Sequence, residues 1–382
     1  MRTRILALLL LPILALASCA RGVDAPAAAS APTPAGAMTL DYATQFSVER
    51  FSDGYALVHV ADGRDYALVP EGRSPSTLGS PNATIVTVPC DRLYLAASSA
   101  GDLLRALDAL DRIACCSTSA ENYAVPELRR ALESGAIRYV GKYSAPEYET
   151  LLSEKCRLAI ESTMVYHTPK VREQLERLGI PTLIERSNYE TEPLGRLEWI
   201  KLYGLLLGQE EEAFAVFERA KRTVDELTTK LDAGESRERK RVAFFYVSSN
   251  GYVNVHKPGD YVCKMIELAG GRNALDGLAL EPERVSALST VNVDWEAFYQ
   301  QAVDADALIY NGSIDGGMTT LAELIAKNEL FKEFKAVKTG NVWSTSLNMY
   351  QESSRIADAI VDFKLAIDGD ESRPLRYLTR LK

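Results

Sequence analysis

The sequence is poor in histidine and lacks the short motifs that mark common enzymes. Only three histidines occur among its 382 residues, and they form no H-x-H pair. Bare zinc or manganese is captured by converging His, Asp or Glu ligands, so the sequence disfavours such a site. G-x-S-x-G, C-x-x-C, H-E-x-x-H and Walker A motifs are also absent. We therefore expect no catalytic residue, no resident metal and no cofactor.

The chain also lacks a positive net charge and an apolar run long enough to span a membrane. Its formal net charge is −9, which argues against nucleic-acid binding because that function needs a basic face. The apolar segment from Ile5 to Ala17 follows Arg2 and Arg4 and is interrupted by Pro12. It is too short to favour a membrane helix and has the pattern of an export signal. An N-terminal anchor helix is the alternative interpretation.

The apolar segment ends on Leu16-Ala17-Ser18-Cys19, which resembles the lipobox of bacterial lipoproteins. The resemblance implies removal of residues 1–18 as a signal peptide and attachment of acyl chains, such as palmitate, to Cys19. Two acyl chains anchor a protein stably where one is marginal. Residues 19–40 are rich in Ala, Pro and Gly and predict a flexible tether. We expect a lipid-anchored protein on the extracytoplasmic side of the cell membrane.

Five cysteines follow Cys19, at positions 90, 115, 116, 156 and 263. An odd number without tight spacing is not a disulfide framework. Most of them should be small buried side chains. A bridge from Cys90 to Cys115 or Cys116 stays open at this point.

Strand-like and helix-like segments alternate along most of the chain. Asp-Gly pairs at 53–54 and 62–63 predict a small antiparallel β-hairpin element within residues 46–70. Strand-like runs then cover residues 84–89, 112–116, 137–141, 157–161 and 181–185, separated by helical patterns at 100–110, 126–135, 146–154 and 168–179. This order is typical of parallel βαβ units. Four more strand-like runs follow residue 240, again with helical segments between them.

A helical pattern of nearly 40 residues occupies the middle of the chain. Gly204 and Gly208 should divide it, leaving a second helix over about residues 209–232 that is roughly 36 Å long. The predicted fold class is therefore α/β, with two lobes of mainly parallel sheets joined by one long helix. The predicted domains are the N-terminal lobe with its hairpin at 41–192, the interlobe helical segment at 193–234, the C-terminal lobe at 235–370 and a tail at 371–382.

This organisation resembles the substrate-binding lipoproteins of ABC importers, in the class that carries ferric siderophores, haem and cobalamin. The likeness covers most of residues 45–368 and rests on three stretches, at 146–162, 193–218 and 291–312. The first and third repeat one device, a helix with an early Glu that leads into an apolar strand. Cys156-Arg157 departs from the usual Pro-Asp of this family, and the corresponding segment of the second lobe is about two residues longer.

The resemblance implies that one acidic residue on each lobe meets arginines of the permease. By position these residues are Glu149 and Glu296. Exposed ion pairs contribute only about 0 to 1 kcal/mol each, so they would orient the complex more than hold it. The implied partners are a permease and ATPase complex, the membrane through the lipid anchor, and a small-molecule ligand, with the chain itself a monomer.

Candidate ligand-binding residues come from the loops that should follow the strands, because ligands of open parallel sheets bind beyond the carboxyl ends of the strands. The candidates are Arg92, Tyr94, Lys142, Tyr143, Tyr166, His167, Arg186, Tyr189, Tyr252, Lys257, Trp343 and Tyr350; the same loops contain Tyr123, His256, Tyr261, Asn311 and Asn348. Aromatic faces pack flat ligands, while Arg and Lys match carboxylates or catecholates. A bulky anionic chelate would suit such a set.

The sequence therefore predicts a binding lipoprotein that captures a ferric siderophore, haem or a corrinoid in an interlobe cleft and delivers it to an ABC permease. His167 and His256 would suit a haem iron, although ordinary surface histidines are the simpler interpretation. The alternatives are a zinc- or manganese-binding protein of an importer and, further away, a tethered sensor, adhesin or enzyme on the same fold.

Overall fold

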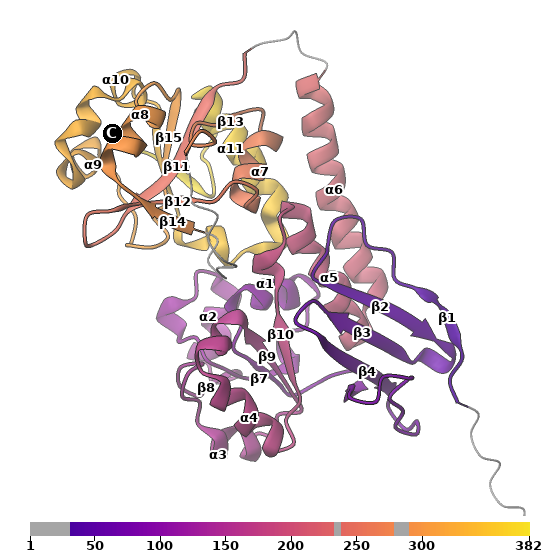
Figure 1. Cartoon of the computed structure of the whole chain (residues 1–382). Coiled ribbons are helices and arrows are strands. Elements are labelled where there is room, and N and C mark those ends of the chain that lie inside the picture. Colours follow the sequence, from indigo (N-terminus) through magenta and orange to yellow (C-terminus); the bar gives the residue numbers. More distant parts are fainter. Residues whose placement is uncertain (1–30, 233–237, 279–289) are drawn as a thin grey trace, which may run out of the picture. The chain divides into compact units, whose positions relative to one another are not determined.

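The computed structural model describes residues 31–232, 238–278 and 290–382. Residues 1–30 are outside this description, and with them the predicted signal peptide, Cys19 and most of the tether. Among the residues described, no helix has both the length and the apolarity needed to cross a membrane. The body from Pro32 to Lys382 is one compact unit, and it contains three sheets (Figure 1).

The first sheet is larger than the predicted hairpin. Its order is β1 (Pro34–Ala37), β2 (Phe46–Phe51), β3 (Ala56–Val60), β4 (Arg64–Pro70) and β5 (Thr84–Val88). The first four strands are antiparallel, and β5 adds parallel to β4. β1 comes from residues that the sequence assigned to the tether, and β5 is the run that it assigned to the first α/β lobe.

The second sheet forms the first lobe and is wholly parallel. Its order is β10 (Thr182–Glu185), β9 (Leu158–Ser162), β6 (Leu93–Leu95), β7 (Ile113–Cys116) and β8 (Arg138–Tyr139). Its helices are α1 (Ser98–Ala106), α2 (Pro126–Glu133), α3 (Tyr148–Ser153) and α4 (Pro169–Arg177). Successive strand residues point to opposite faces. Leu95, Ile160 and Leu183 face one cluster of buried side chains, while Tyr94 and Ala159 face another.

The third sheet forms the second lobe and is mixed. Its order is β14 (Thr290–Val293), β12 (Val253–His256), β11 (Arg241–Val247), β15 (Ala307–Tyr310), β16 (Val342–Thr345) and β17 (Leu378–Arg380), with β13 (Arg272–Asn273) beside β11. β11, β15 and β16 are parallel, whereas β12, β14 and β17 add antiparallel. Its helices are α7 (Tyr261–Leu268), α8 (Trp295–Ala302), α9 (Leu321–Lys327), α10 (Lys335–Thr339) and α11 (Ile356–Asp368). β17 comes from residues predicted to be a tail.

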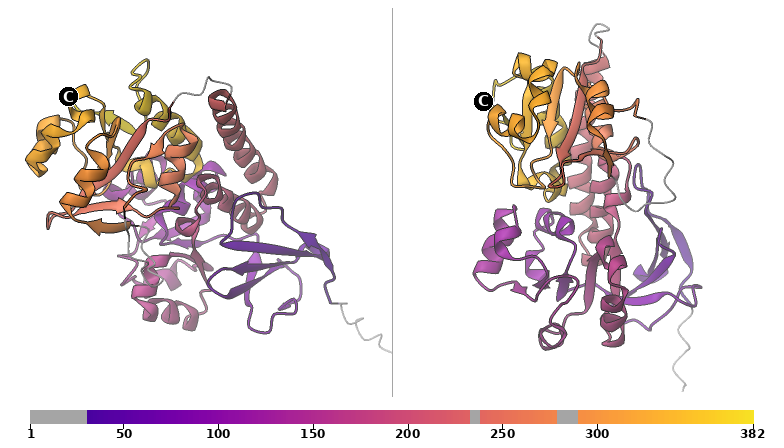
Figure 2. Two further views of the ribbon diagram at one scale, coloured as in Figure 1. Left: turned by 45° about the horizontal axis from the view of Figure 1, so that its top comes forward. Right: turned by 60° about the vertical axis from the view of Figure 1, so that its left-hand side comes forward.

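Two consecutive helices connect the lobes, as the glycine pattern predicts. Helix α5 (Pro193–Leu207) ends at Gly208, whose φ of +72° is the left-handed conformation that favours glycine at a helix end. Helix α6 (Glu210–Asp232) follows and packs against α11 of the second lobe. Gly204 lies inside α5, where a Cβ atom would be 2.5 Å from the Cβ of Ala213 on α6. Glycine therefore permits the close crossing of the two helices (Figure 2).

Helix α5 is buried on every side, and all fifteen of its residues are inaccessible to solvent or nearly so. It belongs to a hydrophobic cluster that runs from the first sheet through one face of the first lobe into α7 and α11. A helix that is apolar all round is typical of a core position. Only α6 of the two interlobe helices has a solvent-facing side.

Two buried carboxylates attach the N-terminal segment to this helix. Glu198 accepts hydrogen bonds from the backbone N–H groups of Asp41, Tyr42 and Ala43 at 2.7–3.1 Å and pairs with Lys201 at 2.6 Å. Glu190 accepts from the backbone N–H groups of residues 44 and 45 at 2.8 and 3.0 Å. Gly195 of α5 lies next to this segment, where a Cβ atom would be only 3.1 Å from the carbonyl oxygen of Tyr42. Glycine therefore allows the close approach of the segment to the helix.

We predict that Glu198→Gln lowers the free energy of unfolding by about 3 kcal/mol, because the amide turns an N–H₂ group toward donors and leaves Lys201 unpaired. Urea denaturation measures this loss. Glu212→Gln, at an exposed position in the first turn of α6, is the matched control and should change stability by less than about 0.5 kcal/mol. Equal stability of the two variants would contradict the proposed attachment.

Candidate ligand-binding site

Three of the predicted ligand-binding residues meet at the carboxyl ends of two neighbouring strands in the first lobe. Arg186 follows β10, and its Nη1 donates a hydrogen bond to Tyr166 Oη at 2.8 Å. The Arg186 guanidinium also lies 4.4 Å from the centre of the Tyr189 ring. Tyr166 comes from the short helix Thr163–His167 that follows β9. This cluster presents one cation and two aromatic faces, a combination suited to an anionic, flat ligand.

The first sheet also contributes to this cluster. Gln45 Oε1 accepts hydrogen bonds from Nε and Nη2 of Arg186 at 3.2 and 3.1 Å. Tyr166 Oη donates to Asp62 Oδ2 at 3.4 Å, and burial raises the pKa of this tyrosine. No pattern in the sequence predicts Gln45 as a site residue, because its segment lies outside the βαβ units.

A second group of polar side chains, in the other lobe, combines residues that follow the parallel strands β15 and β16 with the last residue of the antiparallel strand β12. Tyr350 follows β16, and its hydroxyl accepts a hydrogen bond from Asn311 Nδ2 at 2.9 Å. The same hydroxyl lies 3.5 Å from His256 Nε2, at the end of β12. Nδ1 of His256 is 2.8 Å from Asp260 Oδ1. Burial raises the pKa of Tyr350 well above its ordinary value, so its hydroxyl stays protonated at neutral pH.

A buried arginine, Arg196, lies between the first lobe and α7 of the second lobe in the chain's core. It lies on α5, is 6% exposed, and its guanidinium sits 4.0 Å from the centre of the Tyr261 ring on α7 of the second lobe. The charge of Arg196 lowers the pKa values of both Tyr350 and Glu185, although burial is the larger effect and raises each of them. Arg196 Nε has no hydrogen-bond partner among the described residues. Arg196 is thus a buried cation that packs on Tyr261 of the second lobe, interacts electrostatically with Glu185 of the first, and has an Nε donor without a described partner.

Glu185, the last residue of β10, is a buried carboxyl group in this region. It accepts hydrogen bonds from the backbone N–H of Ser187 at 3.0 Å and from Ser99 Oγ at 3.2 Å. Within the described part of the chain, Asn348 Oδ1 and Ser353 Oγ are two more buried polar atoms without a partner. Buried polar groups are normally satisfied, so such atoms indicate room for a water molecule or a polar ligand.

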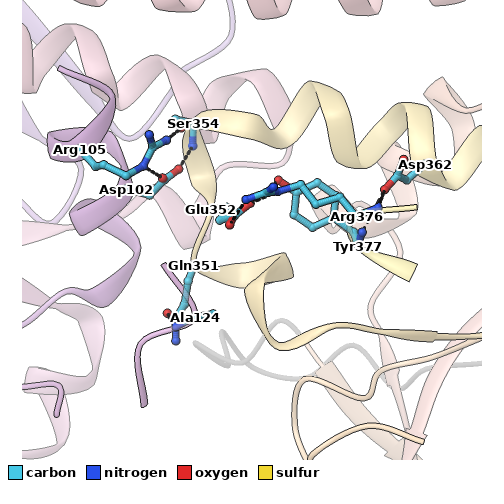
Figure 3. Close-up of polar contacts among 9 residues, drawn as sticks. All are labelled: Asp102, Arg105, Ala124, Gln351, Glu352, Ser354, Asp362, Arg376 and Tyr377. Atoms are coloured by element: carbon cyan, nitrogen blue, oxygen red, sulfur yellow. Dashed lines mark hydrogen bonds and ion pairs between the residues drawn. The ribbon is translucent and has the colours of Figure 1, made fainter. Parts of the chain in front are cut away.

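Gln351, in the segment that also holds Asn348 and Ser353, forms one of the direct links between the two lobes. Gln351 Oε1 accepts from the backbone N–H of Ala124 at 2.7 Å (Figure 3). Its Nε2 donates to the carbonyl oxygen of Asn122 at 2.8 Å. The neighbouring Glu352 fixes this loop, because Arg376 and Tyr377 bind its carboxylate at 2.6–2.7 Å. Burial opposes ionisation of Glu352, but these hydrogen bonds outweigh it and lower its pKa.

Three other candidates are in the framework of the lobes. Arg92 precedes β6 and binds Glu154, while Tyr94 lies within β6 and Trp343 within β16, both fully buried. The strand pattern predicts that Arg92 lies in a loop at the carboxyl end of a first-lobe strand, residues 84–89. That strand belongs to the first sheet instead, so Arg92 lies at the amino end of β6. Trp343 donates from Nε1 to Asn341 Oδ1 at 2.7 Å and packs in the core.

Tyr94 points into the core beside an unusual carboxyl group. Its hydroxyl and both oxygens of Glu161 are buried without a hydrogen-bond partner among the described residues. Burial raises the pKa of Glu161 to about 8, so this side chain is mostly neutral at pH 7. A neutral acid costs far less to bury than a carboxylate.

The remaining candidates lie in surface segments and do not join either group. These are Lys142, Tyr143, His167, Tyr252 and Lys257. Tyr143 packs partly against the first lobe, and Tyr252 is 51% exposed. The five cysteines among the described residues are all buried and free. No group of three or more His, Cys, Asp or Glu side chains suited to a metal ion occurs in the described ranges.

Comparison with known proteins identifies the family of the chain. The model of the periplasmic binding protein family matches residues 95–346. The chain belongs to this family. A Methanocaldococcus jannaschii protein named as an uncharacterized lipoprotein is 26% identical over 364 residues, which cover 91% of this chain and 88% of the relative.

Solved periplasmic binding proteins share the fold. One from Veillonella parvula has a TM-score of 0.60 at 18% identity and covers 85% of this chain and 98% of its own. A periplasmic haem-binding protein from Pseudomonas aeruginosa has a TM-score of 0.59 at 17% identity, covering 76% and 98%. A petrobactin-binding protein from Bacillus subtilis has a TM-score of 0.58 at 12% identity, covering 82% and 99%. The two-lobed α/β prediction is thus confirmed.

Proposed function

We propose that this chain is an extracytoplasmic solute-binding lipoprotein that captures an iron chelate, haem or a corrinoid between its two lobes and delivers it to an ABC permease. Membership of the periplasmic binding protein family supports solute binding as such. Two fold relatives are named for haem and petrobactin, which supports this class of cargo. The same family consists of binding proteins rather than enzymes, in line with the absence of catalytic motifs.

The observation that carries the proposal is the position of Arg196. A buried guanidinium on the central helix packs on Tyr261 of the second lobe, interacts electrostatically with Glu185 of the first and with Tyr350 of the second, and has an Nε donor without a described partner. Arginine binds carboxylates, catecholates and propionates with charge-assisted hydrogen bonds. Arg186 would supply a second cation at the edge, with Tyr166 and Tyr189 packing against a flat cargo. Tyr350 and His256 would approach the cargo from the second lobe.

Entry of a cargo requires that Gln351 release the backbone of residues 122 and 124. Two neutral hydrogen bonds contribute only about 1 to 3 kcal/mol together, so binding can displace them. Cargo atoms would then satisfy Arg196 Nε, Asn348 Oδ1 and Ser353 Oγ. This exchange makes capture favourable without a large change in the protein.

We predict saturable binding of at least one of three probes, namely haemin, a ferric siderophore and cyanocobalamin, to the full chain. Tryptophan fluorescence quenching and native mass spectrometry measure it. Arg186→Gln should weaken the affinity about tenfold or more, because one charge-assisted contact is lost, and Arg186→Lys should lie between it and the parent chain. Arg177→Gln, at an exposed position on α4, is the control. Absence of binding for all three probes would contradict the proposal.

Docking to the permease is proposed to use Glu149 and Glu296. Both are exposed and occupy the second position of their helices, α3 and α8. Each helix leads into the strand that pairs with the first parallel strand of its lobe, β9 with β6 and β15 with β11. This equivalence supports a matched pair of acidic contacts, one from each lobe.

The double substitution Glu149→Arg with Glu296→Arg should abolish cargo uptake in cells that carry the cognate permease, while cargo affinity stays unchanged. Repulsion between like charges at both contacts is the reason. Glu127→Arg with Glu329→Arg makes the same change of charge elsewhere on the two lobes and should leave uptake intact. Full uptake by the first pair would refute this docking assignment.

A further inference from the structure

A hollow of about 340 Å³ lies where α1, α6 and the start of α11 meet. It is lined by side chains from the first lobe, the interlobe helix and the second lobe; those used below are Arg105, Arg219, Thr223, Ser354, Arg355 and Asp358. None of them belongs to the ligand-binding groups described above. The volume equals that of roughly ten water molecules, which is more than a single oxyanion fills.

Two hydrogen bonds fix the side chain of Arg105. Its Nε donates to Asp102 Oδ1 at 2.6 Å, and its Nη2 donates to Ser354 Oγ at 3.1 Å. Asp102 is fully buried and also accepts from the backbone N–H of Ser354 at 2.8 Å (Figure 3). Asp102 therefore fixes Arg105 and ties the first lobe to residue 354 of the second. A guanidinium fixed in this way needs little further ordering to bind an anion.

The other two arginines of the hollow form no ion pair within the described part of the chain. Arg219 and Arg355 lack an ion pair or side-chain hydrogen bond with any residue that the structure describes, and Asp358 is the one lining carboxylate. Arg219 is exposed on α6, and Arg355 is half-buried in the short helix Ser353–Arg355. The lining of the hollow thus carries three cations and one carboxylate, whereas the chain as a whole has a net charge of −9.

We propose that this hollow binds a compact polyanion with two or more phosphoryl groups, held by Arg105, Arg219 and Arg355. Guanidinium groups match phosphate oxygens in paired hydrogen bonds, and the hydroxyls of Thr223 and Ser354 add neutral polar atoms to the lining. Because the three arginines come from three separate elements, one phosphoryl group does not engage all of them as well as a linked pair does. The site does not depend on the cargo proposed above.

Isothermal titration of the full chain with inorganic pyrophosphate at low salt tests this site. We expect saturable binding of one equivalent, at least about tenfold tighter than that of orthophosphate, and weakening as salt is added. Arg219→Gln and Arg355→Gln should each reduce the affinity about tenfold. Both side chains lack partners, so thermal unfolding of these variants should match that of the parent chain.

Arg222→Gln is the matched control, because Arg222 is an exposed, unpaired arginine on the same helix that does not line the hollow. It should leave pyrophosphate binding unchanged. Three results would overturn the proposal: no saturable binding at millimolar pyrophosphate, equal affinity for orthophosphate, or an equal loss in Arg222→Gln. Titration with haemin or a ferric siderophore in the same variants is a separate readout, so failure of either proposal leaves the other testable.

Discussion

The structure depends on the complete burial of helix α5. Each of its fifteen residues is enclosed, and the cluster around it continues from the N-terminal sheet through the first lobe to α7 and α11 of the second lobe. Protein interiors are close-packed, so a helix inside a continuous core does not shift without disturbing its neighbours. The two lobes therefore share one core along α5, and they are not independent bodies on a flexible linker.

The polar side chains of α5 are few, and each performs a distinct task. Glu198 and Lys201 attach the N-terminal segment, whereas Arg196 packs on Tyr261 of the second lobe. A binding residue on a rigid helix keeps its geometry better than one on a loop. The other parts of the proposed site are the loops around Arg186 and Gln351, which hydrogen bonds to Gln45 and to the backbone of residue 124 hold in place.

Local patterns in the sequence were sufficient for much of this architecture. The alternation of β-rich and amphipathic segments predicted the α/β lobes, and the glycines predicted the division between α5 and α6. The loops that this pattern places after β9 and β10 contain Arg186, Tyr166 and Tyr189, which lie in contact in the structure. The physical reason is that parallel strands must end at one edge of their sheet, whatever the tertiary details.

The failures arose where partners are distant in sequence. Nothing in residues 84–88 tells which sheet they join, so the pattern predicts Arg92 and Tyr94 in a ligand-facing loop of the first lobe, whereas Arg92 precedes β6 and Tyr94 lies within it. β1 and β17 pair with strands whose identity only the folded chain determines. Arg196 is a residue that the loop pattern does not reach, because it lies inside the mostly apolar helix "PLGRLEWIKLYGLLL"; charged side chains are rarely buried unless they are paired.

The central claim of this account is that α5 and its continuous core hold the two lobes in a nearly fixed relation while cargo binds between them. Small-angle X-ray scattering of the full chain, with and without a cargo that binds, tests it most directly. The account predicts a radius of gyration that is unchanged within error, because the movement is confined to loops. A marked compaction on binding would contradict it and would indicate hinge closure of the kind seen when lobes are joined by flexible segments.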